Sequence, residues 1–113
     1  MIEELKKIHA CKEALQFIEG FGSLQEAWDN MERADWMAWI LGKTCDNVDE
    51  LLTVLAECAI DGEVENNKIE RFVKRIEREN NSYRRALNMA YFMALTKTNV
   101  CDRIRDYYPK SPI

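Results

Sequence analysis

The chain has 113 residues, of which 47% are hydrophobic and 32% are charged, and its net charge at neutral pH is −4. This length predicts a single domain, residues 1–113, with enough chain to bury a hydrophobic core of its own. The composition excludes a disordered or collagen-like chain, and the acidic balance argues against binding of nucleic acid through the protein's overall charge.

The compartment is predicted from the absence of export and membrane signals. No apolar run approaches the roughly 20 residues that a membrane-spanning helix needs, and the charged segment 1–7 does not resemble a secretory signal. We therefore expect a cytoplasmic protein without a membrane partner. Its four cysteines, Cys11, Cys45, Cys58 and Cys101, lack the close pairing of zinc sites. We expect reduced thiols in the core, with no metal and no cofactor.

Hydrophobic periodicity predicts helices along the whole chain, because the two prolines lie within the last five residues. The first predicted helix ends at Gly20 and Gly22. It carries one apolar stripe, consisting of Ile2, Leu5, Ile8, Cys11, Leu15 and Ile18. A second, short helix follows, and Ser23 and Glu26 are spaced to form a capping box at its start.

A third predicted helix covers residues 36–41, with Asp35 as its N-cap and Gly42 as its end. It is apolar on all sides, so we expect it at the centre of the core. Asp46 or Asn47 caps a fourth helix, which ends at residues 61–62. The inward side of this helix is predicted to be Val48, Leu51, Leu52, Leu55, Cys58 and Ala59.

A fifth helix is predicted to begin near Asn66 or Asn67, with an inner face of Ile69, Phe72 or Val73, and Ile76. After a break at residues 80–82, Ser82 is predicted to cap a long last helix that reaches Tyr107 and spans about 39 Å. Its apolar residues are Tyr83, Leu87, Ala90, Tyr91, Ala94, Val100, Cys101, Ile104 and Tyr107 or Tyr108. The fold class is therefore all-α, an irregular bundle of five to six helices with one long C-terminal helix.

The net charge hides a division of the chain. Residues 1–65 hold 15 acidic and 5 basic residues, whereas residues 66–113 hold 5 acidic and 11 basic residues, so the halves carry net charges of −10 and +6. Basic side chains recur every three or four positions along the fifth helix, which places them on one face. The candidate partner-binding residues are Lys68, Arg71, Lys74, Arg75, Arg78, Arg84 and Arg85. The candidate acidic surface is Glu26, Asp29, Glu32, Glu63 and Glu65.

Three interpretations of this division are open. We favour mutual neutralisation of the halves, within the fold or between the subunits of a homodimer, with ordinary helix pairs such as Glu70–Lys74 and Arg75–Glu79. The second interpretation is a basic face for an acidic partner. The third is an acidic face for a basic groove, such as a nucleic-acid channel. Direct binding of nucleic acid is less favoured, because no exposed aromatic residues are interleaved with the basic stripe.

Groups suited to catalysis are scarce. His9 is the one histidine, and it lies one helical turn from Glu13, a common setting for a half-buried histidine beside a surface carboxylate. The sequence contains no Gly-rich phosphate loop, no Gly-x-Ser-x-Gly motif and no His-Glu-x-x-His motif. We therefore expect a protein that is not an enzyme.

Three tryptophans, Trp28, Trp36 and Trp39, fall within twelve residues of one another. We expect them to be part of the core, and the alternative is an exposed aromatic contact site for a partner. Arg33 is expected to pair with a neighbouring acid or to stack on an indole, while Asp35 caps the helix.

Segments toward both ends of the chain resemble a family of small helical proteins from phages and bacteria. The first segment is residues 23–28, Ser-Leu-Gln-Glu-Ala-Trp, with residues 33–41, Arg-Ala-Asp-Trp-Met-Ala-Trp-Ile-Leu. The turn at residues 59–63 and the C-terminal stretch at residues 100–109 are similar to the same family. Some members are described as immunity proteins of toxin systems. The resemblance implies an all-α fold and a phage or prophage setting, and it implies no site residue.

Small size, few catalytic groups and segregated charge favour a protein that acts by binding. We expect a phage-type protein that binds and inhibits a host macromolecule, such as a nucleic-acid-directed defence complex, in the manner of an anti-CRISPR protein. One alternative is an immunity protein that neutralises a toxin, and a protein partner is expected in both cases. The other alternative is a regulator that binds nucleic acid through Arg71, Lys74, Arg75 and Arg78.

Overall fold

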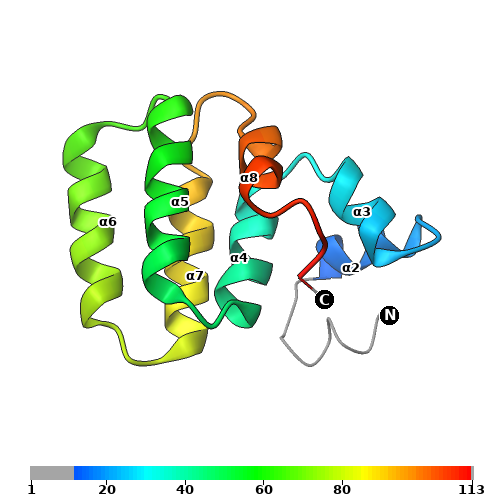
Figure 1. Ribbon diagram of the computed structural model, residues 1–113, viewed down its shortest axis with the longest axis horizontal. Coiled ribbons are helices and arrows are strands. Elements are labelled where there is room, and N and C mark those ends of the chain that lie inside the picture. The colour runs from blue at the N-terminus through cyan, green and yellow to red at the C-terminus, as the bar shows by residue number, and fades with distance from the viewer. Residues whose placement is uncertain (1–11, 113) are drawn as a thin grey trace.

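The computed structural model describes residues 12–112, which form seven α-helices and no strand (Figure 1). The all-α prediction is therefore confirmed for this part of the chain. The helices are α2 (Lys12–Glu19), α3 (Leu24–Asn30), α4 (Ala34–Thr44), α5 (Val48–Asp61), α6 (Asn66–Arg78), α7 (Ser82–Met93) and α8 (Cys101–Tyr107). Ile2, Leu5, Ile8, His9 and Cys11, which belong to the first predicted helix, lie outside the described residues.

The helices α4 and α7 pack along each other and form the centre of the bundle. α5 covers one side of this pair, and α6 lies at the edge of the molecule against α5 and α7 (Figure 1). α8 packs on α4 and α5, while α2 and α3 lie at the end opposite α6. α7 therefore separates the edge helix α6 from α4.

The prediction of one long C-terminal helix is wrong, because residues 94–100 interrupt it between α7 and α8. The hydroxyl of Thr96 donates a hydrogen bond to the Met93 carbonyl oxygen at 2.8 Å and so competes with the helical ladder. The backbone N–H of Lys97 donates to the Gly62 carbonyl oxygen at 2.8 Å, which ties the segment to the end of α5. The side chain of Asn99 then accepts from the N–H of Cys101 at the start of α8.

Polar side chains mark three helix starts. The Ser23 hydroxyl accepts from the N–H of Glu26 at 3.1 Å, and the Glu26 carboxylate accepts from the N–H of Gly22, so the capping interaction at α3 is confirmed with its return bond shifted by one residue. Asn47 caps α5 through its side-chain oxygen. At α7 the cap is Asn81 and not the predicted Ser82.

Both predicted ends of the central helix are wrong. α4 begins at Ala34, with Arg33 at the N-cap position, and it runs through Gly42 to Thr44. A Cβ atom at Gly42 would lie 2.8 Å from the Cα of Ala86 in α7, so this glycine allows the backbones of α4 and α7 to approach closely. Gly42 thus serves helix packing and does not end the helix.

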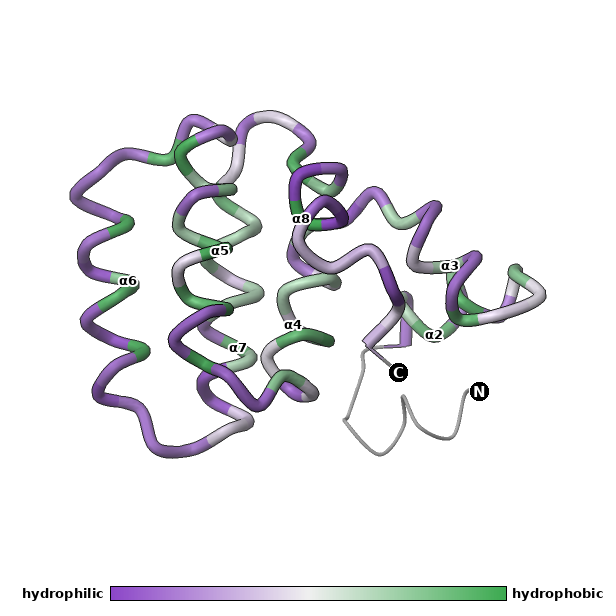
Figure 2. The backbone as a smooth tube through the Cα atoms, in the orientation of Figure 1, coloured by the Kyte–Doolittle hydropathy of each residue, from purple (hydrophilic) through white to green (hydrophobic). Residues whose placement is uncertain are grey.

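The core lies where α4, α5 and α7 meet α8 and the inner face of α6. Met37, Ala38 and Leu41 of α4 are almost fully buried, which confirms a central position for this helix. At the edge, the rings of Phe72 in α6 and Phe92 in α7 stack with centroids 3.8 Å apart. Colouring by hydropathy shows hydrophilic and hydrophobic residues alternating along α6, whereas α4 is mostly hydrophobic (Figure 2).

None of the helices described in residues 12–112 has the length and the apolar character that a membrane span requires. Cys45, Cys58 and Cys101 are free thiols, and the latter two are buried as expected. Cys45 is only partly buried, at the end of α4.

Candidate macromolecule-binding surface

The edge helix α6 has one buried face and one exposed face. Ile69, Phe72 and Ile76 are buried against the bundle, which confirms the predicted inner face. At about 100° per residue, the five basic residues of α6 fall within an arc of about 120° on the exposed side. No acidic residue of α6 lies inside this arc, because Glu70 and Glu77 occupy one flank of it. The five residues are Lys68, Arg71, Lys74, Arg75 and Arg78, and all are exposed.

These cations have no counterion among the residues that the structure describes. No ion pair joins any of them to another residue within 12–112, and the same is true of the exposed Arg84 of α7. The expected helix pairs Glu70–Lys74 and Arg75–Glu79 are therefore not formed. We call the five cations of α6 together with Arg84 the basic surface.

Arg85 was predicted with this group, but it plays a different part. It is half-buried, and its Nη1 donates a hydrogen bond to the Glu79 carbonyl oxygen at 3.3 Å. Because Glu79 follows the last residue of α6, this contact holds the connection between α6 and α7. Arg85 therefore belongs to the scaffold that supports the basic surface.

The candidate acidic residues do not form one surface. Glu26, Asp29 and Glu32 lie on or beside α3, whereas Glu63 and Glu65 lie in the connection between α5 and α6, at the other end of the molecule (Figure 1). Two of them are already engaged. Glu26 accepts from Gly22, and Asp29 accepts from the amide of Gln25 at 2.8 Å.

Neutralisation between the two halves of the chain is slight within the fold. Among the described residues a single ion pair joins the acidic half to the basic half, between Arg103 Nε and Asp61 Oδ2 at 2.7 Å. Both side chains are nearly half exposed, so solvent screens this pair. The charge of the basic surface is therefore left uncompensated by the residues packed around it.

A groove of about 550 Å³ lies where α2, α4 and α7 meet, on the side of α7 away from α6, and Lys12, Glu13, Ala14 and Ile18 of α2 form part of its wall. Its walls are largely aromatic and apolar, and they include Trp36, Trp39, Tyr83, Leu87 and Tyr91. The rings of Trp39 and Tyr83 meet edge to face at 5.4 Å. The buried Nε1 of Trp39 has no hydrogen-bond partner among residues 12–112, so the groove wall holds an unused donor.

The three tryptophans thus have two settings. Trp28 is 1% exposed, and its Nε1 donates to the Tyr108 carbonyl oxygen at 2.8 Å, so its assignment to the core is confirmed. Trp36 and Trp39 are half-buried and line the groove. Arg33 makes both of the contacts that the sequence suggested as alternatives, since it pairs with Asp35 at 2.7 Å and lies 4.5 Å above the Trp36 ring.

Sequence reasoning chose the wrong apolar stripe for α7. The residues that it named in this helix, including Tyr83, Leu87 and Tyr91, line the groove, and Tyr91 is 65% exposed. The buried face consists instead of Ala86, Met89, Phe92 and Met93. The spacing of Tyr83, Leu87 and Ala90 was the one signal of a second apolar side on this helix.

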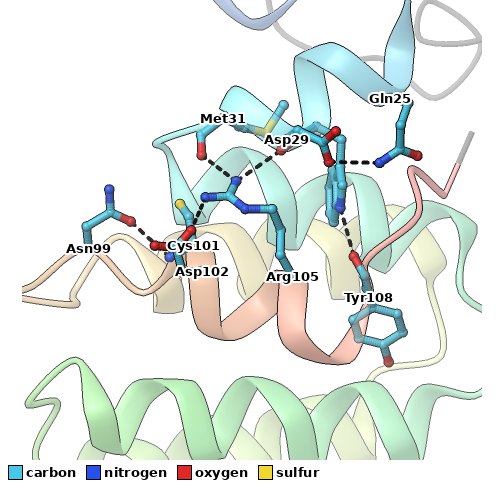
Figure 3. A network of polar contacts seen from close by, with 9 residues as sticks. Gln25, Asp29, Met31, Asn99, Cys101, Asp102, Arg105 and Tyr108 are labelled. Atoms are coloured by element: carbon cyan, nitrogen blue, oxygen red, sulfur yellow. Dashed lines mark hydrogen bonds and ion pairs between the residues drawn. The ribbon is translucent and has the colours of Figure 1, made fainter.

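Unlike the cations of the basic surface, Arg105 of α8 lies within a network of polar contacts, which Figure 3 shows. Arg105 donates to the carbonyl oxygens of Trp28 and Met31 at 3.0 and 2.8 Å, and its Nη2 lies 2.6 Å from Asp102. These contacts hold α8 against the end of α3. Arg105 therefore has a structural role.

The described residues offer little for catalysis. Burial raises the pKa of the Cys58 and Cys101 thiols to about 11, so neither is a thiolate nucleophile at neutral pH. Within 12–112, no group of three or more His, Cys, Asp or Glu side chains is placed to hold a metal ion. The features with recognition chemistry are the basic surface and the aromatic groove.

Neither a protein-family model, nor a curated protein, nor a solved structure matches this chain.

Proposed function

We propose that this chain is a cytoplasmic binding protein that attaches to an acidic macromolecule through the basic surface and inhibits it. The acidic macromolecule would belong to a host complex, as expected for a phage-type inhibitor. No catalytic step is assigned to the chain itself.

The observation that carries this proposal is the set of six exposed cations that form no ion pair with any residue of 12–112. Like charges three and four residues apart on a helix repel one another and cost stability. Arg75 and Arg78 lie in the last turn of α6, where the helix dipole favours cations. Lys68 and Arg71 lie nearer the start of the helix, where the helix dipole does not favour cations. A structural role therefore leaves these two residues unexplained, whereas an acidic partner would make use of the whole set.

The resemblance to small phage and bacterial proteins supports an inhibitor in particular. Such a protein acts by covering a surface of its target, which needs a compact scaffold and a contact face but no catalytic groups. The immunity-protein alternative uses the same logic with a toxin as the target, so identification of the captured partner separates the two.

The test compares two variants that change the net charge equally. Arg71→Glu with Arg75→Glu reverses two charges in the basic surface. Lys97→Glu with Lys110→Glu reverses two exposed charges outside it. Affinity capture from host lysate should recover a specific partner with the unchanged chain and the control, and at least tenfold less of it with the basic-surface variant. Equal capture by both variants, or no specific partner at all, would refute the proposal.

A further inference from the structure

The basic surface continues across the seam between α6 and α7. The stacked rings of Phe72 and Phe92 mark where these two helices touch. On α6, Lys68 and Arg75 lie about one turn before and after Phe72, so they border the seam. On α7, Asn88 stands one turn before Phe92 in the same way. The cations of α6 therefore lie beside the exposed side of α7.

An exposed aromatic ring lies on that side of α7. Tyr91 is 65% exposed, and it follows Arg84 by seven residues, which places both on one face of the helix. Tyr91 also lines the groove between α7 and α4. Tyr91 thus lies between the basic surface and the aromatic groove, which are one helix width, roughly 10 Å, apart.

The groove suits a flat, partly polar ring. Trp36 and Trp39 supply aromatic surface, and the buried Trp39 Nε1 is a donor without an acceptor among residues 12–112. Lys43 places its Nζ 5.7 Å from the centre of the Tyr83 ring and so adds a cation at this wall. Nucleobases present π-faces for stacking and acceptor atoms for such a donor.

The row of cations suits a regularly repeated anion. Lys68, Arg71, Arg75 and Arg78 follow one another every three or four residues, over about 15 Å of helix. Arginine predominates in the basic surface, and its planar guanidinium binds phosphate oxygens in pairs. A polynucleotide offers phosphates at such regular intervals, and only an unpaired strand leaves its bases free to reach an aromatic groove.

We infer that the acidic macromolecule is a single-stranded nucleic acid, with its phosphates on the basic surface and its bases against Tyr91 and in the groove. This inference rests on the proposed function and names the class of its partner. An acidic protein would satisfy the cations but would leave the meeting of cations, exposed ring and groove without a use.

The first test measures binding of the purified full chain to labelled oligonucleotides by fluorescence anisotropy, at about 50 mM salt. Single-stranded RNA and single-stranded DNA are the two probes, and a duplex and polyglutamate are the competitors. We expect a single strand to bind with a Kd in the micromolar range, with both competitors at least tenfold weaker. With six cations engaged, the affinity should fall with salt at a log–log slope of up to about −4.

Two variants test the cations and the exposed aromatic ring separately, and a third serves as the control. Arg71→Glu with Arg75→Glu should lower the affinity by more than about 30-fold and flatten the salt dependence. Tyr91→Ala should lower it by about 5- to 100-fold through lost stacking, with the salt slope unchanged. Tyr107→Ala removes an exposed tyrosine on α8 and should leave binding unchanged. Circular dichroism confirms that each variant is folded.

Binding of polyglutamate or duplex as tightly as a single strand, or an unchanged affinity after Tyr91→Ala, would overturn the inference. The two proposals also fail separately. A partner that is captured through the basic surface and that stays bound after nuclease treatment would make the partner an acidic protein. In that case the proposed function stands and the assignment to nucleic acid falls.

Discussion

The cations of α8 and those of α6 come from the same basic half of the chain, yet the fold puts them to opposite uses. Arg105 of α8 keeps 19% of its side chain exposed and donates to two backbone carbonyls. Arg103 pairs with Asp61 and Asp106. The cations of α6 are exposed and pair with no residue among 12–112.

The difference follows from where each helix lies. α8 packs on α4 and α5 and is held to the end of α3, so its polar side chains meet backbone carbonyls and carboxylates from other elements. α6 lies at the edge against α5 and α7, and its outer side faces solvent. Segregated charge in a sequence therefore becomes an exposed charged surface only where the fold brings no partners near it.

The largest expected effect is alkaline destabilisation at the contact between α5 and α8. The pKa of Cys58 and that of Cys101 are raised from 9.0 to about 11, because burial disfavours the thiolate. The folded state therefore holds these protons longer than the unfolded state does. This stabilisation is fully present below pH 9 and is lost as the pH rises through 11, on the order of 2–3 kcal/mol for each thiol.

Urea unfolding at a series of pH values from 8 to about 11 measures this loss. The double variant Cys58→Ala with Cys101→Ala is less stable at pH 8, because it leaves cavities, but its stability should depend less on pH. An equal pH dependence of the variant and the unchanged chain would show that the thiols are not its source.

Replacement of Arg105 is the next test. Arg105→Met leaves the Met31 carbonyl oxygen without its donor and takes one of two donors from the Trp28 carbonyl oxygen, which keeps its bond from the Met31 N–H. We expect the free energy of unfolding to fall by about 2 kcal/mol. Arg78→Met, the matched change on α6, should alter it by less than about 0.5 kcal/mol. Chemical denaturation of both variants gives the comparison directly. Equal losses would mean that the two regions do not differ as described.

The connection between α5 and α6 contains a strained residue. Glu63 has a φ of 64°, and the N–H of Val64 donates to the Ala59 carbonyl oxygen at 2.9 Å, as in a Schellman motif that usually has glycine at this position. We expect Glu63→Gly to raise the free energy of unfolding by about 0.5–1 kcal/mol. Glu63→Ala keeps the Cβ atom and should bring no such gain. A loss of stability in the glycine variant would contradict this explanation.

The smallest effect concerns repulsion within the basic surface. Arg71 and Arg75 are four residues apart on α6 and carry like charges, so Arg71→Gln with Arg75→Gln should stabilise the fold by a few tenths of a kcal/mol at low salt. The gain should disappear in about 1 M salt, where the Debye length is short. Thermal unfolding at the two salt concentrations checks it, and a destabilised variant would indicate a structural role for these arginines.

Local sequence signals predicted what depends on neighbours within one helix. The cap at Ser23 and Glu26 and the inner face of α6 at Ile69, Phe72 and Ile76 are set by hydrogen bonds and spacings within a few residues. The end of α4 was missed because a glycine in this position has two possible structural roles. It can end a helix, or it can let two helices touch, and only Ala86 on the facing helix decides between them.

The candidate site likewise has one part that the sequence predicted and one part that it did not. The exposed cations of α6 could be found from the sequence, since an amphipathic helix shows its polar side by spacing alone. The part played by Tyr91 and Trp39 could not be found, because they lie on different helices and meet only at the groove. The break after Met93 was missed for a similar reason, since the bond between Lys97 and Gly62 joins residues far apart in the chain.

The sequence by itself determined an all-helical fold for residues 12–112, the starts of α3, α5 and α6, the buried side of α6 and the division into an acidic and a basic half. These properties come from short-range periodicity and composition. Only the tertiary structure decided which arginines serve the fold and which stay free, and which apolar side of α7 is buried. Those outcomes depend on which side chains and carbonyl groups of neighbouring helices come into contact, and the pattern of residues along one helix does not contain that information.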